Sequence, residues 1–279
     1  MVSPVDAPDP HAPFALAQQA AERLAELTGV VRHDVALVLG SGWGGAADLL
    51  GDTVAEIPAE QVPGFHKPVV AGHGASIRSV RIDGDDGAPD RYALVLGSRT
   101  HYYESRDTRA VAHGVRTAAA AGVQRLVLTN GCGGLDPALV PGTPVLISDH
   151  INLTGASPLE GATFVDLTDL YSARLRAVAR EVDPTLTEGV YVQLPGPHYE
   201  TPAEVRMTAL LGGTLVGMST ALEAIAARHV GLEILGLSLV TNHAAGISPD
   251  PLSHEEVIAA GREAGPRISG LLAQIVRRI

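Results

Sequence analysis

The stretch VALVLGSGWGG, residues 35–45, decides the class of fold. Its first five residues are all apolar and run directly into a glycine-rich turn, which is typical of a short strand buried within a covered sheet. Comparable apolar runs recur along the chain and alternate with segments of helical periodicity. This alternation predicts an α/β domain with a largely parallel central β-sheet flanked by helices.

The segments on either side of this strand complete the predicted domain. Residues 14–27 have the apolar spacing of an amphipathic helix, which Gly29 would end. Further strands are expected over 126–129, 145–148, 189–193, 215–217 and 234–240, with a hairpin of 77–82 and 92–96. Further helices are expected over 108–121, 171–182, 202–211, 220–229 and 253–279, the last with Ser253 and Glu256 as a capping box. We therefore expect a flexible leader at 1–13 and a single domain at 14–279.

The composition narrows the classes of function. The 279 residues carry a formal net charge of −11 and no run of Lys or Arg, which argues against nucleic acid or an anionic membrane as partner. Cys132 is the only cysteine, so no intramolecular disulfide can form, and no Cys/His spacing indicates a metal site. Neither a signal peptide nor an apolar window long enough for a transmembrane helix is present. We therefore expect a cytoplasmic protein without a metal.

The glycine turn has a rival interpretation. Residues 40–45 (GSGWGG) fit the G-x-G-x-x-G pattern of dinucleotide-binding folds, in which backbone N–H groups approach a phosphate. Such folds also require a second strand that ends in an acidic residue about 20 residues further on. Residues 56–61 (EIPAEQ) lie there instead, with a proline inside and no apolar run. This context disfavours a dehydrogenase.

A second rival is a serine hydrolase. Residues 216–221 (VGMSTA) lie between a predicted strand and a predicted helix, like a nucleophile elbow, and Asp250 and His254 follow in the expected order. However, Ala221 replaces the second glycine of that motif, and Asp250 and His254 are only four residues apart. Ser219 can equally be the N-cap of the following helix.

Eight short segments point to another family. In chain order they are LGSG (39–42), GHG (72–74), RTHYYE (99–104), TNGCGGL (129–135), DHINL (149–153), GPHYET (196–201), VGMST (216–220) and TNHAAG (241–246). In these segments the chain resembles the trimeric, low-molecular-mass purine nucleoside phosphorylases, and its last segment resembles their bacterial members. The resemblance implies a single domain around a mixed, distorted sheet, a homotrimer, and no cofactor, with inorganic phosphate as co-substrate. The implied activity is the reversible phosphorolysis of 6-oxopurine (deoxy)ribonucleosides, such as inosine and guanosine, to free base and (deoxy)ribose 1-phosphate in purine salvage.

The resemblance assigns a phosphate site to Ser41, Arg99, His101, Gly131 and Ser219. These residues offer hydroxyls, a planar guanidinium, a ring N–H and, at Gly131, a backbone N–H in a crowded turn, all of which suit an anion. His73, in a glycine-rich loop, is expected beside them.

Different chemistry is expected at the purine. Glu200 can accept from N1–H of a 6-oxopurine, and the amide of Asn242 can donate to N7, where negative charge builds as the glycosidic bond breaks. With His101, these two are the expected catalytic residues. The resemblance adds a stacking Tyr199, a packing Met218, ribose contacts from Tyr103 and His254, lining by Gly217 and Thr241, and Phe164 entering the neighbouring subunit's site.

Residues 242 and 132 lead to two further expectations, and one alternative function is weighed against the presence of the site residues. Asparagine at 242 favours inosine and guanosine, because relatives that act on adenine nucleosides are expected to carry aspartate there. Cys132 puts a thiol beside the phosphate site, where a buried, inert cysteine is favoured over an oxidation-sensitive one. A non-catalytic nucleoside-binding protein is disfavoured by the presence of Arg99, Glu200 and Asn242.

Overall fold

The computed structural model describes residues 9, 11–66, 76–84, 89–97, 99–247 and 254–279, with the side chains of His254 and Glu256 left out. Within these residues a nine-stranded mixed sheet has the order β2-β3-β4-β1-β5-β8-β7-β6-β9. The strands are β1 (Val35–Val38), β2 (Asp52–Pro58), β3 (Ser76–Ile82), β4 (Arg91–Leu96), β5 (Arg125–Gly134), β6 (Pro144–Asn152), β7 (Thr187–Gln193), β8 (Leu215–Gly217) and β9 (Glu233–His243). Because β9 also pairs with β5, the last five strands in this order close into a ring.

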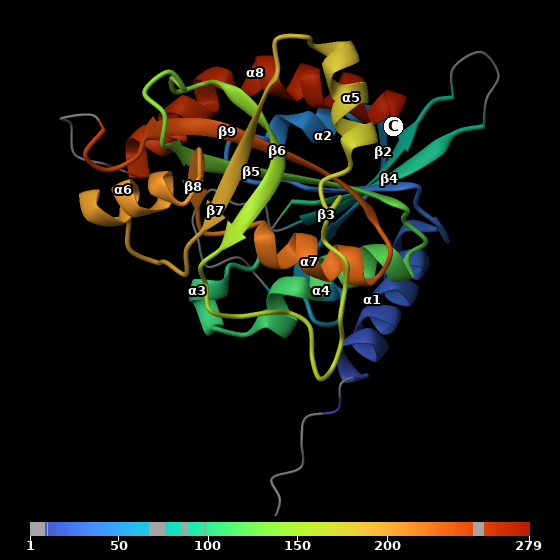
Figure 1. Ribbon diagram of the computed structural model, residues 1–279. Helices are drawn as coiled ribbons and strands as arrows, with labels where there is room; N and C mark the ends of the chain where they lie inside the picture. The colour runs from blue at the N-terminus through green and yellow to red at the C-terminus, as the bar shows by residue number, and fades with distance from the viewer. Residues whose placement is uncertain (1–8, 10, 67–75, 85–88, 98, 248–253) are drawn as a thin grey trace, which may run out of the picture.

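Helices cover both faces of the sheet (Figure 1). The helices α1 (Ala12–Thr28), α4 (Thr108–Ala120) and α7 (Ala221–His229) pack together below it, and α2 (Ala47–Leu50), α5 (Ala173–Val182) and α8 (His254–Arg278) lie above it. Two short helices, α3 (Tyr102–Ser105) and α6 (Pro202–Leu210), lie at one end of the sheet. The helical turns η1 (Gly44–Ala46) and η2 (Ala59–Gln61) complete the elements.

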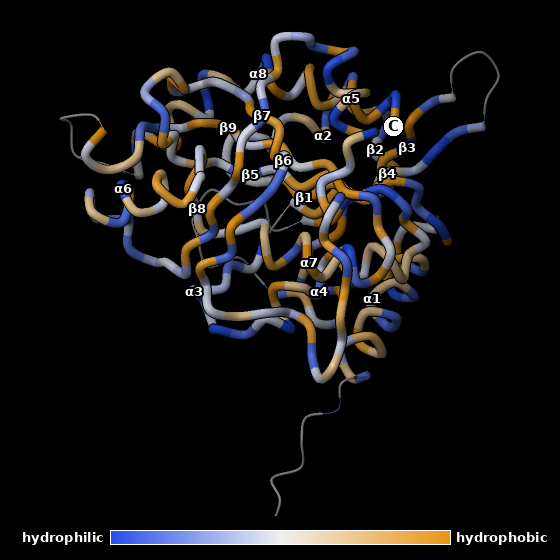
Figure 2. Tube along the Cα trace, in the orientation of Figure 1, coloured by the Kyte–Doolittle hydropathy of each residue, from blue (hydrophilic) through white to orange (hydrophobic). Residues whose placement is uncertain are grey.

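The apolar run that opens the domain explains this layering. Ala36 and Val38 of β1 pack in the core that also contains residues of α1 and α4, whereas Val35 and Leu37 pack in the core beneath α8. Successive side chains of a strand point to opposite faces, so a strand covered on both faces must be apolar throughout. Figure 2 shows the hydrophobic colour concentrated in the central strands and in the inner sides of the helices.

Several predicted elements are confirmed. Gly29 ends α1 with a positive φ of 72° and donates its N–H to the carbonyl of Ala25, as expected of a helix C-cap. The hairpin of β3 and β4 is antiparallel, as predicted. The helix α1 begins at Ala12, two residues earlier than expected, because Pro13 is tolerated in its first turn.

Several expectations about strands were wrong, and β6 also runs four residues beyond its predicted end at Ser148, to Asn152. Residues 52–58, for which no strand was expected, form β2, an edge strand whose side chains are mostly exposed and which pairs antiparallel with β3. Strand β5 runs through the glycine segment to Gly134, so Gly131 lies within a strand and not in a turn. The parallel partner of β5, β9, likewise runs three residues further than predicted, to His243.

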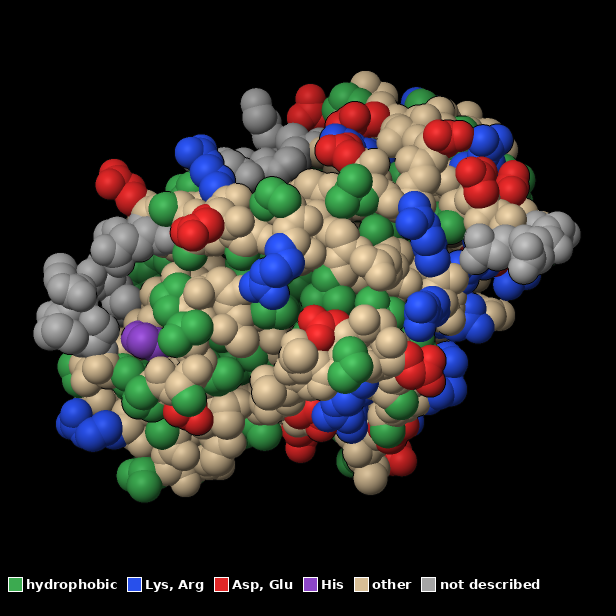
Figure 3. All heavy atoms as spheres, turned by 90° about the horizontal axis from the view of Figure 1, so that it is seen from above, with side chains coloured by type: hydrophobic (Ala, Val, Ile, Leu, Met, Phe, Trp, Pro, Cys, Tyr) green, Lys and Arg blue, Asp and Glu red, His purple; other side chains and the backbone are tan. Residues whose placement is uncertain are grey.

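Charged side chains are distributed over the face above the sheet without a single dominant sign. Seen from above, Lys and Arg side chains are interspersed with Asp and Glu side chains (Figure 3). In the described residues, no helix is both long and apolar enough to cross a membrane.

Candidate active site

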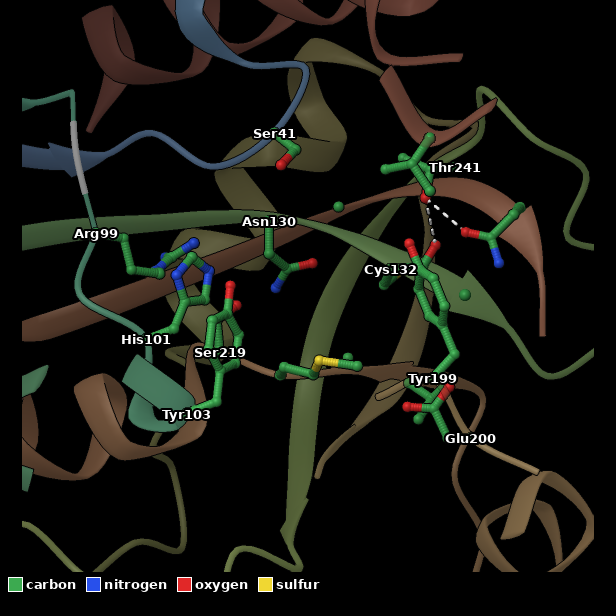
Figure 4. A pocket seen from close by; sticks show the side chains of 17 residues that line it. Ser41, Arg99, His101, Tyr103, Asn130, Cys132, Tyr199, Glu200, Ser219 and Thr241 are labelled. Atoms are coloured by element: carbon green, nitrogen blue, oxygen red, sulfur yellow. Dashed lines mark hydrogen bonds between the residues drawn. The ribbon is translucent and has the colours of Figure 1, made fainter. Parts of the chain in front are cut away.

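The predicted site residues gather where parallel strands end. Strands β4, β1, β5 and β9 run parallel to one another, so their carboxyl ends lie at one edge of the sheet. A pocket of about 150 Å³ lies there (Figure 4). It is lined by Ser41, Arg99, His101, Tyr103, Asn130, Gly131, Cys132, Gly133, Tyr199, Glu200, Val216, Gly217, Met218, Ser219, Thr241, Asn242 and Val257.

The glycine turn after β1 is shaped by close packing against β5. A Cβ atom on Gly40 would lie 2.6 Å from the carbonyl oxygen of Thr129, so only glycine fits at this point. Trp43 is fully buried and donates its indole N–H to the carbonyl of Asn130 at 2.9 Å. These contacts hold Ser41 at the edge of the pocket.

Arg99 brings a buried cation to the pocket. Its guanidinium donates from Nε to Glu223 Oε2 at 2.8 Å and from Nη1 to the carbonyl of Thr129 at 2.8 Å. The arginine side chain is 2% exposed and the glutamate side chain 5% exposed. The third nitrogen of the Arg99 guanidinium, Nη2, is buried and has no hydrogen-bond partner among the described residues. A buried guanidinium N–H without an acceptor favours an anion as its partner.

A strained turn presents Ser219 to the same region. Thr220, the N-cap of α7, has a φ of 80°, a conformation that threonine rarely adopts. Its hydroxyl lies 3.1 Å from Ser219 Oγ and accepts the side-chain N–H of Asn130 at 2.9 Å. The carbonyl oxygen Oδ1 of Asn130 is buried without a partner in the described structure.

His101 and Tyr103 form one wall of the pocket. His101 caps α3, and the Oε1 atom of Glu104 accepts its backbone N–H at 2.6 Å and lies 3.2 Å from its Nδ1. The imidazole also stacks on the ring of Tyr103, with 4.8 Å between the ring centroids and an interplanar angle of 13°. The carboxylate and the stacked ring therefore fix the orientation of the imidazole.

A β-bulge aims Asn242 into the opposite wall. In the register of β5 with β9, Cys132 faces Val240 but Gly133 faces Asn242, so Thr241 is the extra residue. The Thr241 hydroxyl lies 2.8 Å from Asn242 Oδ1 and 3.1 Å from the carbonyl of Cys132, as the dashed lines of Figure 4 mark. The Asn242 amide donates one N–H to the carbonyl of His243 at 2.9 Å. Its oxygen is therefore held by Thr241, and its second N–H is a donor for a ligand.

Glu200 supplies the acceptor of this wall. It is 9% exposed and immediately precedes Thr201, the N-cap of α6, whose capping box with Glu204 fixes the start of that helix. Burial raises the pKa of the Glu200 carboxyl above its usual value of 4.5. The ring of Tyr199, 41% exposed, lies beside it. Among the described residues, no group of three or more His, Cys, Asp or Glu side chains could hold a metal ion.

Comparison with known proteins identifies the family. A sequence model of the phosphorylase superfamily matches residues 34–277. The purine nucleoside phosphorylase of Cellulomonas sp is 68% identical over 266 residues, which cover 95% of this chain and 94% of that protein. The chain belongs to the purine nucleoside phosphorylases, within the phosphorylase superfamily. The likeness to the Cellulomonas protein also confirms the expected bacterial type.

Solved structures agree with this assignment to the purine nucleoside phosphorylases. The Schistosoma mansoni purine nucleoside phosphorylase in complex with inosine is 30% identical and superposes with a TM-score of 0.84, covering 95% of this chain and 96% of that one. Its complex with adenosine gives 31% identity and a TM-score of 0.83, covering 94% and 96%. The mixed-sheet fold of one phosphorylase domain is thereby confirmed.

Family membership removes the rival interpretations of the sequence. As a purine nucleoside phosphorylase the chain is an enzyme, a pentosyltransferase, and not a dehydrogenase, a hydrolase or a binding protein without catalysis. The strand that follows the glycine turn in the chain, β2, does not pair with β1 as the second strand of a dinucleotide fold would, but lies at the edge of the sheet beside β3. The hydrolase triad cannot be traced, because Asp250 and the side chain of His254 lie outside the described residues.

The structure brings most of the predicted phosphorylase site together. The pocket is lined by Ser41, Arg99, His101, Tyr103, Gly131, Tyr199, Glu200, Gly217, Met218, Ser219, Thr241 and Asn242. Phe164 does not line it and is 94% exposed in the single chain. His73 and the side chain of His254 lie outside the described residues, so their predicted roles stay predictions. A Cβ atom on Gly131 would lie 3.2 Å from Thr241 Cγ2, so tight packing between strands, and not a turn, favours glycine there.

Three residues whose side chains form hydrogen bonds around the phosphorylase pocket were given no role by sequence reasoning. Asn130 and Trp43 stood in the quoted motifs but were given no role. Glu223 had a usable signal, because Thr220 and Glu223 have the spacing of a capping box at the start of a helix. That spacing gives no hint of the ion pair with Arg99, which lies 124 positions away in the sequence.

Proposed function

We propose that this pocket carries out the phosphorolysis of 6-oxopurine nucleosides, with inosine and guanosine as substrates. The observation that supports it most directly is the division of the pocket into two walls. A buried, partly unpartnered guanidinium lies with Ser219 on one side. The carboxylate of Glu200 lies on the other side with Thr241, whose hydroxyl contacts the amide of Asn242. The first wall suits a phosphate and the second suits a purine with an N1–H donor and an N7 acceptor.

The proposed reaction is a direct displacement at C1′. Phosphate, held by Ser41, Arg99, His101 and Ser219 with Gly131 at its side, attacks C1′ on the face opposite the base. The C1′–N9 bond breaks through an oxocarbenium-like transition state, and its electron pair goes to the purine. The second N–H of Asn242 stabilises the charge that builds at N7. The products are the free base and the α-1-phosphate of ribose or deoxyribose.

The remaining residues of the pocket hold the nucleoside. Glu200 accepts from N1–H, Tyr199 stacks on the purine, and Met218 packs at the ribose, with Gly217 and Thr241 behind it. Tyr103 contacts the ribose, and His254 is proposed for its 5′-hydroxyl and His73 for the phosphate. The displacement proposed here needs no metal or organic cofactor, because phosphate itself is the nucleophile.

We further propose that the active form is a cytoplasmic homotrimer. The side chain of Phe164 is 94% exposed, and contact with the neighbouring subunit's pocket would bury it with a favourable gain in free energy. Each site would then contain Phe164 of a neighbouring subunit. Analytical ultracentrifugation of the full chain tests this assembly, and a monomer at micromolar concentration would contradict it.

The test of the reaction is inosine turnover with and without inorganic phosphate. We expect hypoxanthine and ribose 1-phosphate to form together and only when phosphate is present. Release of free ribose without phosphate would show a nucleoside hydrolase instead. Adenosine, tested in parallel, should be a poor substrate, because its 6-amino group presents a donor where Asn242 and Glu200 suit an oxo base. We expect kcat/KM for inosine to exceed that for adenosine by about 10⁴-fold.

A further inference from the structure

We call the side of the pocket that carries Arg99 and Ser219 the phosphate wall. It contains a buried carboxylate that the proposed displacement does not use. Glu223 lies in the first turn of α7 and faces Arg99, with both side chains almost completely buried. Its Oε2 atom accepts Nε–H of Arg99 at 2.8 Å. The same atom accepts the backbone N–H of Thr220 at 3.0 Å. One carboxylate oxygen therefore joins the guanidinium to the turn that carries Ser219.

The turn at Thr220 requires such an anchor. A β-branched residue at a φ of 80° is strained, and strain of this kind persists only where the surroundings over-determine the backbone. Glu223 holds the N–H of Thr220, and Asn130 holds its hydroxyl at 2.9 Å. Thr220 has no exposed surface, so no water replaces these contacts. The position of the preceding Ser219 hydroxyl, 3.1 Å from that of Thr220, depends on this conformation.

The guanidinium requires an anchor for a different reason. Its flexible side chain is fixed at two nitrogens, Nε by Glu223 and Nη1 by the carbonyl of Thr129. Two bonds to a planar group determine the direction of the third nitrogen, Nη2, which is the buried donor without a partner in the described structure. Without the contact to Glu223, the plane could rotate about the remaining bond.

We propose that Glu223 is a positioning residue, which aligns the Arg99 guanidinium and the Ser219 hydroxyl as one unit for phosphate. This inference rests on the proposed function of the pocket. The position of the Glu223 oxygen is what matters, because the oxygen must reach both N–H groups at once. Its negative charge acts in the opposite sense, since it opposes the binding of a phosphate anion.

Two substitutions separate position from charge. Glu223→Asp keeps the charge but withdraws the carboxylate by one methylene, so we expect the Kd for inorganic phosphate to rise about 10- to 100-fold. Glu223→Gln keeps an acceptor oxygen at the same reach and removes the charge, so phosphate should bind as tightly as in the wild type or more tightly. Calorimetric titration of the full-length protein with inorganic phosphate measures both values. In inosine phosphorolysis, Glu223→Asp should raise the KM for phosphate and lower kcat. Glu223→Gln should have a KM for phosphate and a kcat close to those of the wild type.

A matched control and a second ligand keep the test specific. Glu204 accepts the N–H of Thr201 at 2.8 Å in the same capping position of α6, away from the phosphate wall. We expect Glu204→Asp to leave the phosphate Kd unchanged, and Glu223→Asp to leave hypoxanthine binding unchanged. The inference is overturned if Glu223→Asp binds phosphate like the wild type, if both aspartate variants weaken phosphate equally, or if hypoxanthine and phosphate binding fall together.

The titration also separates this inference from the proposed function. If the wild type binds phosphate but does not cleave inosine, the proposed function fails while the comparison of Glu223 variants still stands. If the wild type cleaves inosine and Glu223→Asp has normal phosphate affinity and normal kcat, only the role of Glu223 fails.

Discussion

The phosphate wall differs from the opposite side of the pocket, the purine wall, which carries Tyr199, Glu200 and Asn242. The two walls differ in how firmly contacts within the single chain hold their side chains. On the phosphate wall, Arg99, Ser219 and Thr220 are buried and joined by hydrogen bonds that include a shared carboxylate. On the purine wall, Tyr199 is 41% exposed, and Asn242 is held mainly by its sequence neighbours Thr241 and His243. A small anion needs hydrogen-bond donors at fixed positions, whereas a flat base can be bound by contacts with its two faces. The difference indicates that the single chain pre-organises the phosphate wall and holds the purine wall less firmly.

The largest effect is expected from the most rigid element of the phosphate wall. Arg99→Lys keeps the charge but cannot donate to Glu223, Thr129 and phosphate in one fixed fork. We expect kcat/KM for phosphate to fall about 10³-fold, by the loss of donors directed at developing charge. Steady-state phosphorolysis of inosine measures this loss. Arg174→Lys, in an exposed pair with Glu233, is the control and should change the rate less than twofold. A similar small effect at Arg99 would remove the argument for a pre-organised phosphate wall.

The key donor of the purine wall should give a smaller loss and a change of specificity. Asn242→Asp replaces the N–H that faces N7 with a carboxylate, so kcat/KM for inosine should fall about 10²- to 10³-fold. The ratio of adenosine to inosine turnover should rise, because a carboxylate can accept from a 6-amino group. Parallel assays with the two nucleosides measure the ratio. An unchanged ratio would show that Asn242 does not face the 6-position edge of the base.

The two walls were also unequal in what the sequence could predict. The residues of the phosphate wall follow uninterrupted apolar strands and glycine motifs, so their gathering at one sheet edge could be foreseen. The direction of the Asn242 side chain depends on a bulge between β5 and β9, which the pattern of apolar residues does not reveal. Strand β2 was missed because an edge strand with exposed side chains and a proline has no apolar alternation. The pairing of Glu223 with Arg99 depends on tertiary contact alone.

Glu200 allows the purine wall to be tested through pH. Burial raises the pKa of its carboxyl above 4.5, so as the pH falls Glu200 is protonated earlier than an ordinary glutamate. Protonation leaves a neutral acceptor that binds N1–H more weakly than the carboxylate does, so hypoxanthine binding should weaken as the pH falls through this raised pKa. Glu200→Gln should bind hypoxanthine about 10- to 100-fold more weakly and lose this pH dependence. Calorimetric titration from pH 7 downward measures both effects. The same acid-side loss in Glu200→Gln would assign the titration to another group.

Phe164 tests whether the purine wall is completed by a second subunit. Phe164→Ala should raise the KM for inosine about tenfold with little change in kcat, as expected when one aromatic contact is lost. Mixed with chains carrying Asn242→Asp, the Phe164→Ala chains should recover a low KM, because hybrid trimers contain sites with both native residues. Val31→Ala, at another highly exposed apolar residue, is the control and should have no effect. A failure of the mixture to recover would place Phe164 outside the site.

The smallest effect is expected at Cys132, which lies on β5 between the two walls. Its backbone carbonyl contacts Thr241, and any residue supplies a carbonyl, so Cys132→Ala should keep kcat/KM within about threefold and cost about 1 kcal/mol of stability through the lost sulfur. The thiol is 3% exposed, and burial raises its pKa to about 12, so almost none of it is thiolate at pH 8. A thiol reagent should therefore label the native protein far more slowly than the denatured protein, with activity retained. Rapid labelling with loss of phosphorolysis would show that this strand opens to solvent and that the phosphate wall is less rigid than its hydrogen bonds indicate.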